Sequence, residues 1–151
     1  MRLIKKQSND VNETVITFEY RKWNDELEEI VGFIKGKKEY ISGYNQEKAL
    51  CNIKVDDILY FEAVGELVFA YTNDAVYEVK MRLYQAEEQV ENNGILRASK
   101  SMLVNIRKIE SLKSALNGRL LATMVNGEEI MLSRAYSKNI IGYIKSAEEY
   151  K

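Results

Sequence analysis

The amino-acid sequence predicts a mostly β protein with a few α-helices. Short runs of alternating or β-branched residues recur along most of the chain, and such runs are typical of strands. Two Asn-Gly pairs, at 117–118 and 126–127, separate apolar runs, and this dipeptide favours tight β-hairpins. Apolar residues recur at helical spacing in three stretches, near 25–36, 81–92 and 137–148. These features together predict hairpin-linked strands with helices at three places.

The first 44 residues predict a small β-α extension. Residues 14–20, TVITFEY, alternate and include β-branched residues, which favours a strand. Asn24 is suited to cap a helix that begins DELEEIVGFIK, because its side chain can accept a hydrogen bond from the first turn. Acidic residues in that turn suit the helix dipole, and Gly36 is a typical stop signal. A polar bridge with some strand character near Tyr40 then follows.

Residues 45–151 predict a second unit built mainly of short strands. A helix over 81–92 divides it and ends at Asn93-Gly94. The strands expected before this helix cover residues 49–53, 58–63, 67–72 and 76–80. The Asn-Gly pairs predict an antiparallel meander after it, formed by residues 106–116, 119–125 and 129–133. A C-terminal helix from about Ser137 is expected to face the core with Ile140, Ile141, Ile144 and Ala147.

The composition narrows the classes of function. Hydrophobic residues make up 46% and charged residues 30%, which suits an ordinary folded core. We expect a cytoplasmic protein, because the chain has neither a long apolar run nor a secretory leader, and the single Cys51 fits a reducing compartment. Histidine is absent, which removes histidine-activated nucleophiles and the commonest zinc ligand. We therefore expect no enzyme, no cofactor and no metal.

Charge is distributed unevenly along the chain. Residues 1–91 hold 12 Lys and Arg against 18 Asp and Glu, a net charge of −6. Residues 92–151 hold 10 Lys and Arg against 5 Asp and Glu, a net charge of +5. A cationic C-terminal part on a nearly neutral chain suggests an anionic partner such as a phosphate backbone, although chance clustering on a solvated face is an equal alternative.

The segment 97–105, RASKSMLVN, places cations and hydroxyls around an apolar centre. The Ser101 hydroxyl suits a phosphate oxygen, and Lys100 can reach a phosphate or a guanine edge. Ser133 and Arg134 precede the C-terminal helix, where free backbone N–H groups favour an anion, and Lys138 lies one turn further on. Two basic, hydroxyl-bearing loops are therefore candidates for a single anion-binding surface.

Structural roles compete with these assignments. Ser133 can be a helix N-cap, and Arg97 can pair with a carboxylate such as Glu62. Asn105 is better suited to hold a turn, and Tyr136 to pack. A metal site at Asp56, Asp57 and Glu62 is disfavoured, because adjacent strand residues point to opposite faces.

Four segments occur in order along the chain: ILYFEA at 58–63, YEVKMRLYQAEE at 77–88, LRASKSMLVNIRKIESL at 96–112 and LNGRLLATMVNGEEIMLSRAYSKNI at 116–140. Together they resemble the LytTR family, which comprises DNA-binding domains of bacterial transcription regulators. The resemblance covers about residues 45–148. It implies short antiparallel sheets with a helix between them and a C-terminal helix. It also implies a sequence-specific regulator that reads DNA with loops instead of a recognition helix.

The resemblance places three loops against DNA, at residues 64–67, around 100–101 and at 133–138. The DNA-binding candidates on and beside these loops are Gly65, Glu66, Arg97, Ser99, Lys100, Ser101, Ser133, Arg134, Ala135, Tyr136 and Lys138. Two departures from the family pattern matter. Glu66 stands where members often have polar or basic residues, and it would repel a phosphate. Either this loop is offset from the DNA backbone, or Glu66 contacts a cytosine amino group. Ala135 stands where many members carry another polar or basic residue, so either Arg134 takes that role or specificity rests elsewhere.

The resemblance also implies partners. Double-stranded DNA with paired direct repeats is expected, bound by a homodimer, with a small membrane protein as a weaker expectation for a regulator. A phosphoacceptor receiver domain does not fit in 44 residues, so a stand-alone regulator is expected, with residues 1–44 used for dimerisation or regulation. The alternatives are an RNA- or single-strand-binding β domain and a protein-interaction module. The first needs exposed aromatic residues, whereas Phe61, Phe69, Tyr71 and Tyr77 resemble core.

Overall fold

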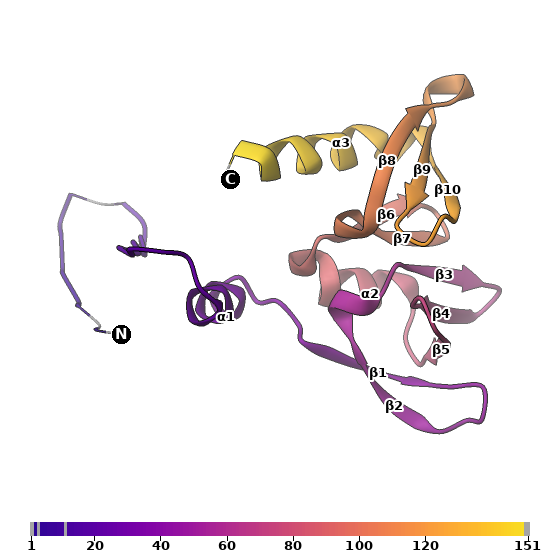
Figure 1. Ribbon diagram of the computed structural model, residues 1–151, viewed down its shortest axis with the longest axis horizontal. Helices are drawn as coiled ribbons and strands as arrows, with labels where there is room; N and C mark the ends of the chain where they lie inside the picture. Colours follow the sequence, from indigo (N-terminus) through magenta and orange to yellow (C-terminus); the bar gives the residue numbers. More distant parts are fainter. Residues whose placement is uncertain (1, 3, 11, 150–151) are drawn as a thin grey trace.

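The computed structural model describes residues 2, 4–10 and 12–149, and side chains as far as Ser146. Within these residues the chain folds into antiparallel strands with three α-helices, which confirms the mostly β fold class (Figure 1). In order the elements are α1 (Asp25–Ile34), β1 (Tyr40–Tyr44), β2 (Leu50–Lys54), β3 (Tyr60–Val64), β4 (Leu67–Tyr71), β5 (Val76–Val79), α2 (Leu83–Val90), β6 (Ile95–Ser99), β7 (Met102–Asn105), β8 (Ile109–Ser114), β9 (Leu120–Met124), β10 (Glu129–Leu132) and α3 (Arg134–Glu149).

Seven strands form the larger sheet, in the order β2-β1-β5-β4-β3-β7-β6. Side chains alternate between the two faces of the sheet, so consecutive residues of β3 pack into different hydrophobic cores. Phe61 points to the face that α2 covers, where it is buried with Leu103 and Ala86. Tyr60 and Val104 point to the opposite face.

The smaller sheet has three strands, in the order β10-β9-β8, and it packs with α3 over that opposite face. Its strands are the predicted meander, and α3 is the predicted C-terminal helix, beginning three residues earlier than expected. Ile140 is fully buried and Ile144 packs against the same core, as their spacing predicted. Ala147 lies outside the described side chains. Strands β3, β6 and β7 are therefore enclosed between α2 and the smaller sheet.

The two Asn-Gly pairs form different turns. Asn117 and Gly118 both have positive φ, 62° and 72°, as a type I′ turn requires. In the second pair Gly127 alone has a positive φ, and its N–H donates to Met124 O. This is the pattern of a type I turn followed by a left-handed glycine, which joins hairpin strands through a longer loop.

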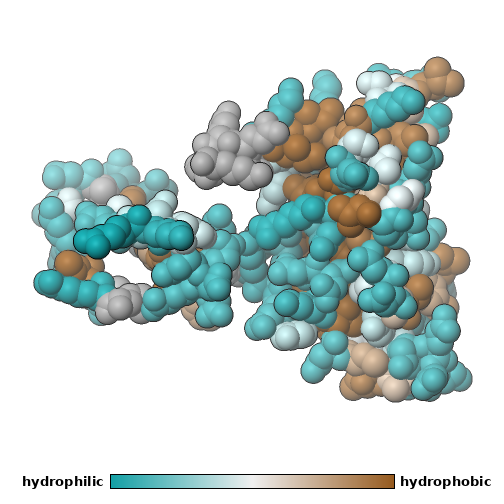
Figure 2. Space-filling model, in the orientation of Figure 1, coloured by the Kyte–Doolittle hydropathy of each residue, from teal (hydrophilic) through white to brown (hydrophobic). Residues whose placement is uncertain are grey.

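The predicted strand at residues 14–20 is wrong, because the structure has no strand there. Val15 and Ile16 are more than half exposed, so this alternating run has no partner strand to bury it. The helix was predicted correctly: α1 follows Asn24, whose side chain accepts the N–H of Leu27 at 3.0 Å. The segment projects from the body, and hydrophilic residues cover much of it on the face that Figure 2 shows.

Asn93 attaches this N-terminal part to the body. It is only 4% exposed, and its amide exchanges two hydrogen bonds with the Lys38 backbone, at 3.0 and 2.7 Å. Two residues after Lys38 the chain enters β1, which joins the larger sheet between β2 and β5. In the described part of the chain, no helix combines the length and apolarity that crossing a bilayer requires.

Candidate nucleic-acid interface

Two hairpin turns lie together at one end of the larger sheet. Gly65 and Glu66 connect β3 to β4, and Lys100 and Ser101 connect β6 to β7. Because Glu62 pairs with Met102, the end of β3 lies beside the start of β7. The Ala63 N–H donates to the Ser101 carbonyl at 2.7 Å, which fixes one turn against the other.

The junction between β10 and α3 completes the group of loops. The Ser133 N–H donates to the Ala98 carbonyl at 2.8 Å, next to the irregularity in β6 between Arg97 and Ser99. All three loops predicted to face DNA therefore lie on one side of the molecule, on the right in Figure 1, opposite α1 and the chain termini. We define residues 64–67, 99–102 and 133–138 as the loop surface.

Arg97 supports the turn at Lys100 from within. Its side chain is 17% exposed and forms an ion pair with Glu87 of α2. Its guanidinium also donates to the Lys100 carbonyl at 3.0 Å. The predicted alternative of a carboxylate partner is therefore observed, with Glu87 in place of Glu62. Lys100 and Ser101 are exposed at the tip that this contact holds.

The N-terminus of α3 offers backbone N–H groups to an anion. The Ser133 carbonyl accepts hydrogen bonds from the N–H groups of Tyr136 and Ser137, both at 3.1 Å. The N–H groups of Arg134 and Ala135 precede this first bonded turn, so they belong to the donors that a helix leaves without an intrahelical partner. The side chains of Arg134 and Lys138 are exposed beside them, and Tyr136 is half-buried.

The Ser133 side chain does not form the N-cap that was considered for it. Its hydroxyl oxygen is buried and has no hydrogen-bond partner in the structure. Asn105 does hold a turn, as expected. It is buried, it donates to the Ile58 carbonyl at 2.8 Å, and it accepts the Arg107 N–H at 3.1 Å.

Sequence reasoning missed the contribution of the β8–β9 turn. A Cβ atom placed on Gly118 would lie 3.3 Å from both Cγ and Cδ of Arg134, so the Arg134 side chain lies across this turn. Arg119, also exposed, donates to the Leu116 carbonyl at 3.2 Å and adds a cation next to Arg134. The Asn-Gly pair predicted the turn, but only the fold shows which side chain rests on it.

The first turn of the loop surface is open. Gly65 has a positive φ of 61°, and a Cβ added there would meet nothing within 4 Å. Glu66 is exposed beside it. In the part of the chain that the structure describes, no group of three or more acidic or cysteine side chains is arranged to hold a metal ion.

Comparison with known proteins identifies the family of this chain. The family model of the LytTr DNA-binding domain matches residues 48–145, and the chain belongs to that family. This confirms the resemblance seen in the sequence motifs. Two relatives, both named uncharacterized HTH-type transcriptional regulators, come from Staphylococcus aureus strains NCTC 8325 / PS 47 and RF122 / ET3-1. They are 30% and 29% identical over 130 residues, which cover 85% of this chain and 87% of each relative.

A solved structure shows the same fold. It is the LytTr DNA-binding domain of a putative methyl-accepting/DNA response regulator from Bacillus cereus. The TM-score is 0.64 at 18% identity, and the match covers 70% of this chain and 98% of that one. Among the described residues, strands separate α1, α2 and α3 from one another, so these helices do not form a helix-turn-helix pair.

Proposed function

We propose that this protein regulates transcription by binding double-stranded DNA through the loop surface. The observation that carries the proposal is that three loops from separate parts of the chain converge, with Lys100, Ser101, Arg134 and Lys138 exposed on them. The relatives named as transcriptional regulators support the same role.

Each part of the surface has a proposed task. Lys100 reaches a base edge in the major groove, and Ser101 donates to a phosphate. The free N–H groups at the start of α3 bind a second phosphate, and Arg134 takes the base-reading role that the short Ala135 cannot fill. Glu66 is the exception, because a carboxylate repels phosphate. We assign it to a cytosine amino group, which donates a hydrogen bond.

Arg97 and Ser133 have supporting tasks in this proposal. Arg97 is paired with Glu87 and with the Lys100 carbonyl, so it positions the loop that carries Lys100. Ser133 connects β10 to β6 through its backbone, and its buried hydroxyl is not placed to reach a phosphate. Ser99, Gly65 and Tyr136 shape the same surface.

The proposal also covers the form of the DNA site and the role of the N-terminal residues. Two copies bind paired direct repeats on one face of the duplex, about one helical turn apart. Residues 45–151 form the DNA-binding unit, and the first 44 residues serve dimerisation or regulation. Phe33 is 86% exposed on α1, which offers an apolar contact to a second copy or to a small membrane protein. The protein acts in the cytoplasm and without catalysis.

Fluorescence anisotropy with duplex fragments from upstream of its own gene tests the proposal at several salt concentrations. With about four to six phosphate contacts per copy, the slope of log affinity against log salt should be roughly −4 to −5. Lys100→Ala should cost about 1–3 kcal/mol on the specific site and relax one base position. Ser101→Ala should weaken all duplexes about equally.

Lys54→Ala is the matched control, because Lys54 is an exposed lysine of the edge strand β2, outside both the loop surface and residues 1–44. It should bind like the parent protein. Circular dichroism must show that each variant is folded. A flat salt response, or parental binding by both Lys100→Ala and Arg134→Ala, would contradict the proposal.

A further inference from the structure

The smaller sheet leaves one of its edges open above the larger sheet. Its strand order places β10 at an edge, with β9 as its partner on one side only. Near its end, β10 comes against the larger sheet, where the Ser133 N–H bonds to Ala98 of β6.

The hydrogen-bond pattern shows which backbone groups of β10 face the open side. In an antiparallel pair, alternate residues point their N–H and C=O toward the partner strand. Glu128 accepts from Met124 on the β9 side, whereas Ser133 donates to Ala98 on the other side. Because the direction alternates, Ile130 and Leu132 point toward β9 like Glu128. The N–H and C=O groups of Glu129 and Met131 point away from β9, like those of Ser133. A strand edge with such free groups is a template for another strand.

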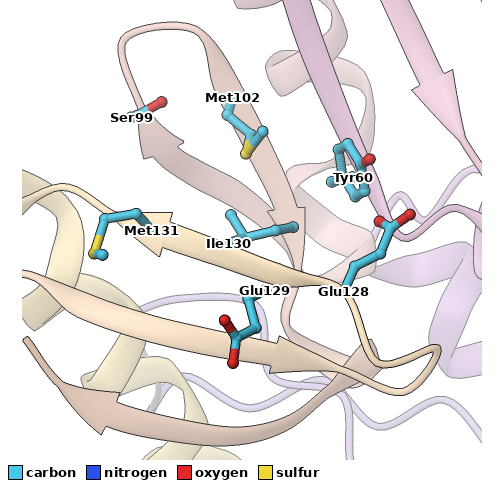
Figure 3. A pocket seen from close by; sticks show the side chains of 7 residues that line it. All are labelled: Tyr60, Ser99, Met102, Glu128, Glu129, Ile130 and Met131. Atoms are coloured by element: carbon cyan, nitrogen blue, oxygen red, sulfur yellow. The ribbon is translucent and has the colours of Figure 1, made fainter.

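A groove of about 410 Å³ lies along this edge. Residues of both sheets line it: Tyr60, Ser99, Met102, Glu128, Glu129, Ile130 and Met131 (Figure 3). The groove therefore has free backbone groups on one wall and side chains of the larger sheet opposite. It shares Ser99 and Met102 with the loop surface but contains none of that surface's cations.

The side chains in and beside the groove combine aromatic rings with carboxylates. Tyr60 stacks on Tyr71, with ring centroids 4.4 Å apart and an interplanar angle of 16°. Burial and the Glu128 carboxylate raise the pKa of Tyr60, and burial and the Glu62 carboxylate raise that of Tyr71. These directions agree with Figure 3, in which the Glu128 carboxylate lies by the Tyr60 ring.

We propose that this groove binds an extended peptide strand of a partner protein, which pairs with β10 and directs a lysine or arginine toward Tyr60, Glu62 and Glu128. The free N–H and C=O groups of Glu129 and Met131 hydrogen-bond the peptide backbone, as in other cases of strand addition. Alternate side chains of the peptide then face the larger sheet.

The charge of the groove indicates which kind of partner it binds. Glu128 and Glu129 line the groove, and Glu62 lies near Tyr71, which stacks on Tyr60, so phosphate groups of a nucleic acid are repelled, whereas a cation is attracted. The Tyr60 and Tyr71 rings favour a cation as well, through their negative faces. Met102 and Met131 suit the apolar stem of a long basic side chain. This site stands independently of the proposed DNA-binding role.

Peptide binding to the full chain tests the proposal. The probe is a fluorescent octapeptide of alternating lysine and valine, acetylated and amidated at its ends, and the readout is anisotropy. The same peptide N-methylated at its valines keeps its charge but loses backbone donors, so it should bind at least tenfold more weakly. A glutamate–valine peptide should not bind. Glu128→Gln should weaken the lysine peptide by threefold or more, and Glu110→Gln, at an exposed position on β8, should leave it unchanged.

Amide hydrogen exchange provides a second readout that charge alone does not change. When the lysine peptide is bound, exchange at the Glu129 and Met131 amides should slow at least tenfold, while the Ile130 amide, already paired with β9, should change little. Equal affinity for the N-methylated peptide would overturn the proposal, because binding would then rest on charge alone. Unchanged exchange at Glu129 and Met131 would overturn it as well.

Discussion

Replacing Glu87 by glutamine distinguishes two roles for Arg97. If Arg97 contacts a phosphate directly, the change frees a cation and removes a nearby negative charge, so DNA binding should become stronger. If Arg97 instead positions the turn at Lys100, the change loosens that turn and DNA binding should become weaker. The structure favours the second role, because Arg97 is 17% exposed and already bonded to both Glu87 and the Lys100 carbonyl.

The expected size of the effect follows from the burial of the pair. Hydrogen bonds to charged groups contribute about 1.5–3 kcal/mol, and a pair whose side chains are 17% and 33% exposed lies near the lower end. Glutamine keeps one acceptor, so the free energy of unfolding should fall by about 1 kcal/mol, or about 2–4 °C in Tm. Ordering the loosened loop on DNA should cost about 0.5–1.5 kcal/mol, which is roughly a 2- to 10-fold loss of affinity.

The assay is anisotropy with one specific duplex, alongside thermal unfolding. Glu88→Gln is the matched control, because Glu88 is an exposed neighbour on α2, and it measures the effect of the lost charge alone. Arg97→Lys keeps the charge but lacks the planar guanidinium that bonds both partners. It should weaken DNA binding without changing the slope of log affinity against log salt. Tighter binding by Glu87→Gln than by Glu88→Gln, or a slope that falls by about 1 in Arg97→Ala, would refute the positioning role.

Three further predictions concern turns, anchoring and pH. Gly118→Ala and Gly127→Ala both force alanine into positive φ and should each cost roughly 1–2 kcal/mol of stability, but only the first should lower DNA affinity, because only its Cβ meets Arg134. Asn93→Ala leaves the Lys38 backbone groups without their partner and should cost about 1–3 kcal/mol in chemical denaturation, with proteolysis increased before residue 40. The raised pKa of Tyr60 means that the unfolded chain ionises first at high pH, so stability should fall above about pH 10 and less so in Tyr60→Phe.

Local patterns predicted those elements whose signals are local. The Asn24 cap, the helix after it and the meander around the Asn-Gly pairs all formed as expected, because caps and turns depend on neighbouring residues. Residues 14–20 show the limit of such patterns. Alternation shows that a segment is able to form a strand, but a strand also needs a partner edge, and the pattern carries no information about that edge.

The sequence predicted that the two basic loops form one surface, but it did not predict the contacts that bring them together. Glu62 was given as an example of a carboxylate partner for Arg97, but the partner is Glu87 on α2, the helix that precedes β6 in the chain. Arg134 and Gly118 are 16 positions apart and meet only because β10 ends beside the start of β9. Contacts between distant segments depend on topology, which spacing along the chain does not encode.

The open turn at Gly65 and Glu66 has a consequence for how such regulators diversify. Gly65 itself has a positive φ that strains other residues, but Glu66, Lys100 and Ser101 are exposed and lie outside both hydrophobic cores. Substitutions at exposed sites like these usually change folding stability by less than about 0.5 kcal/mol. If these turns read DNA as proposed, duplicated genes can acquire new operators by changing exposed turn residues, while the same scaffold is inherited unchanged.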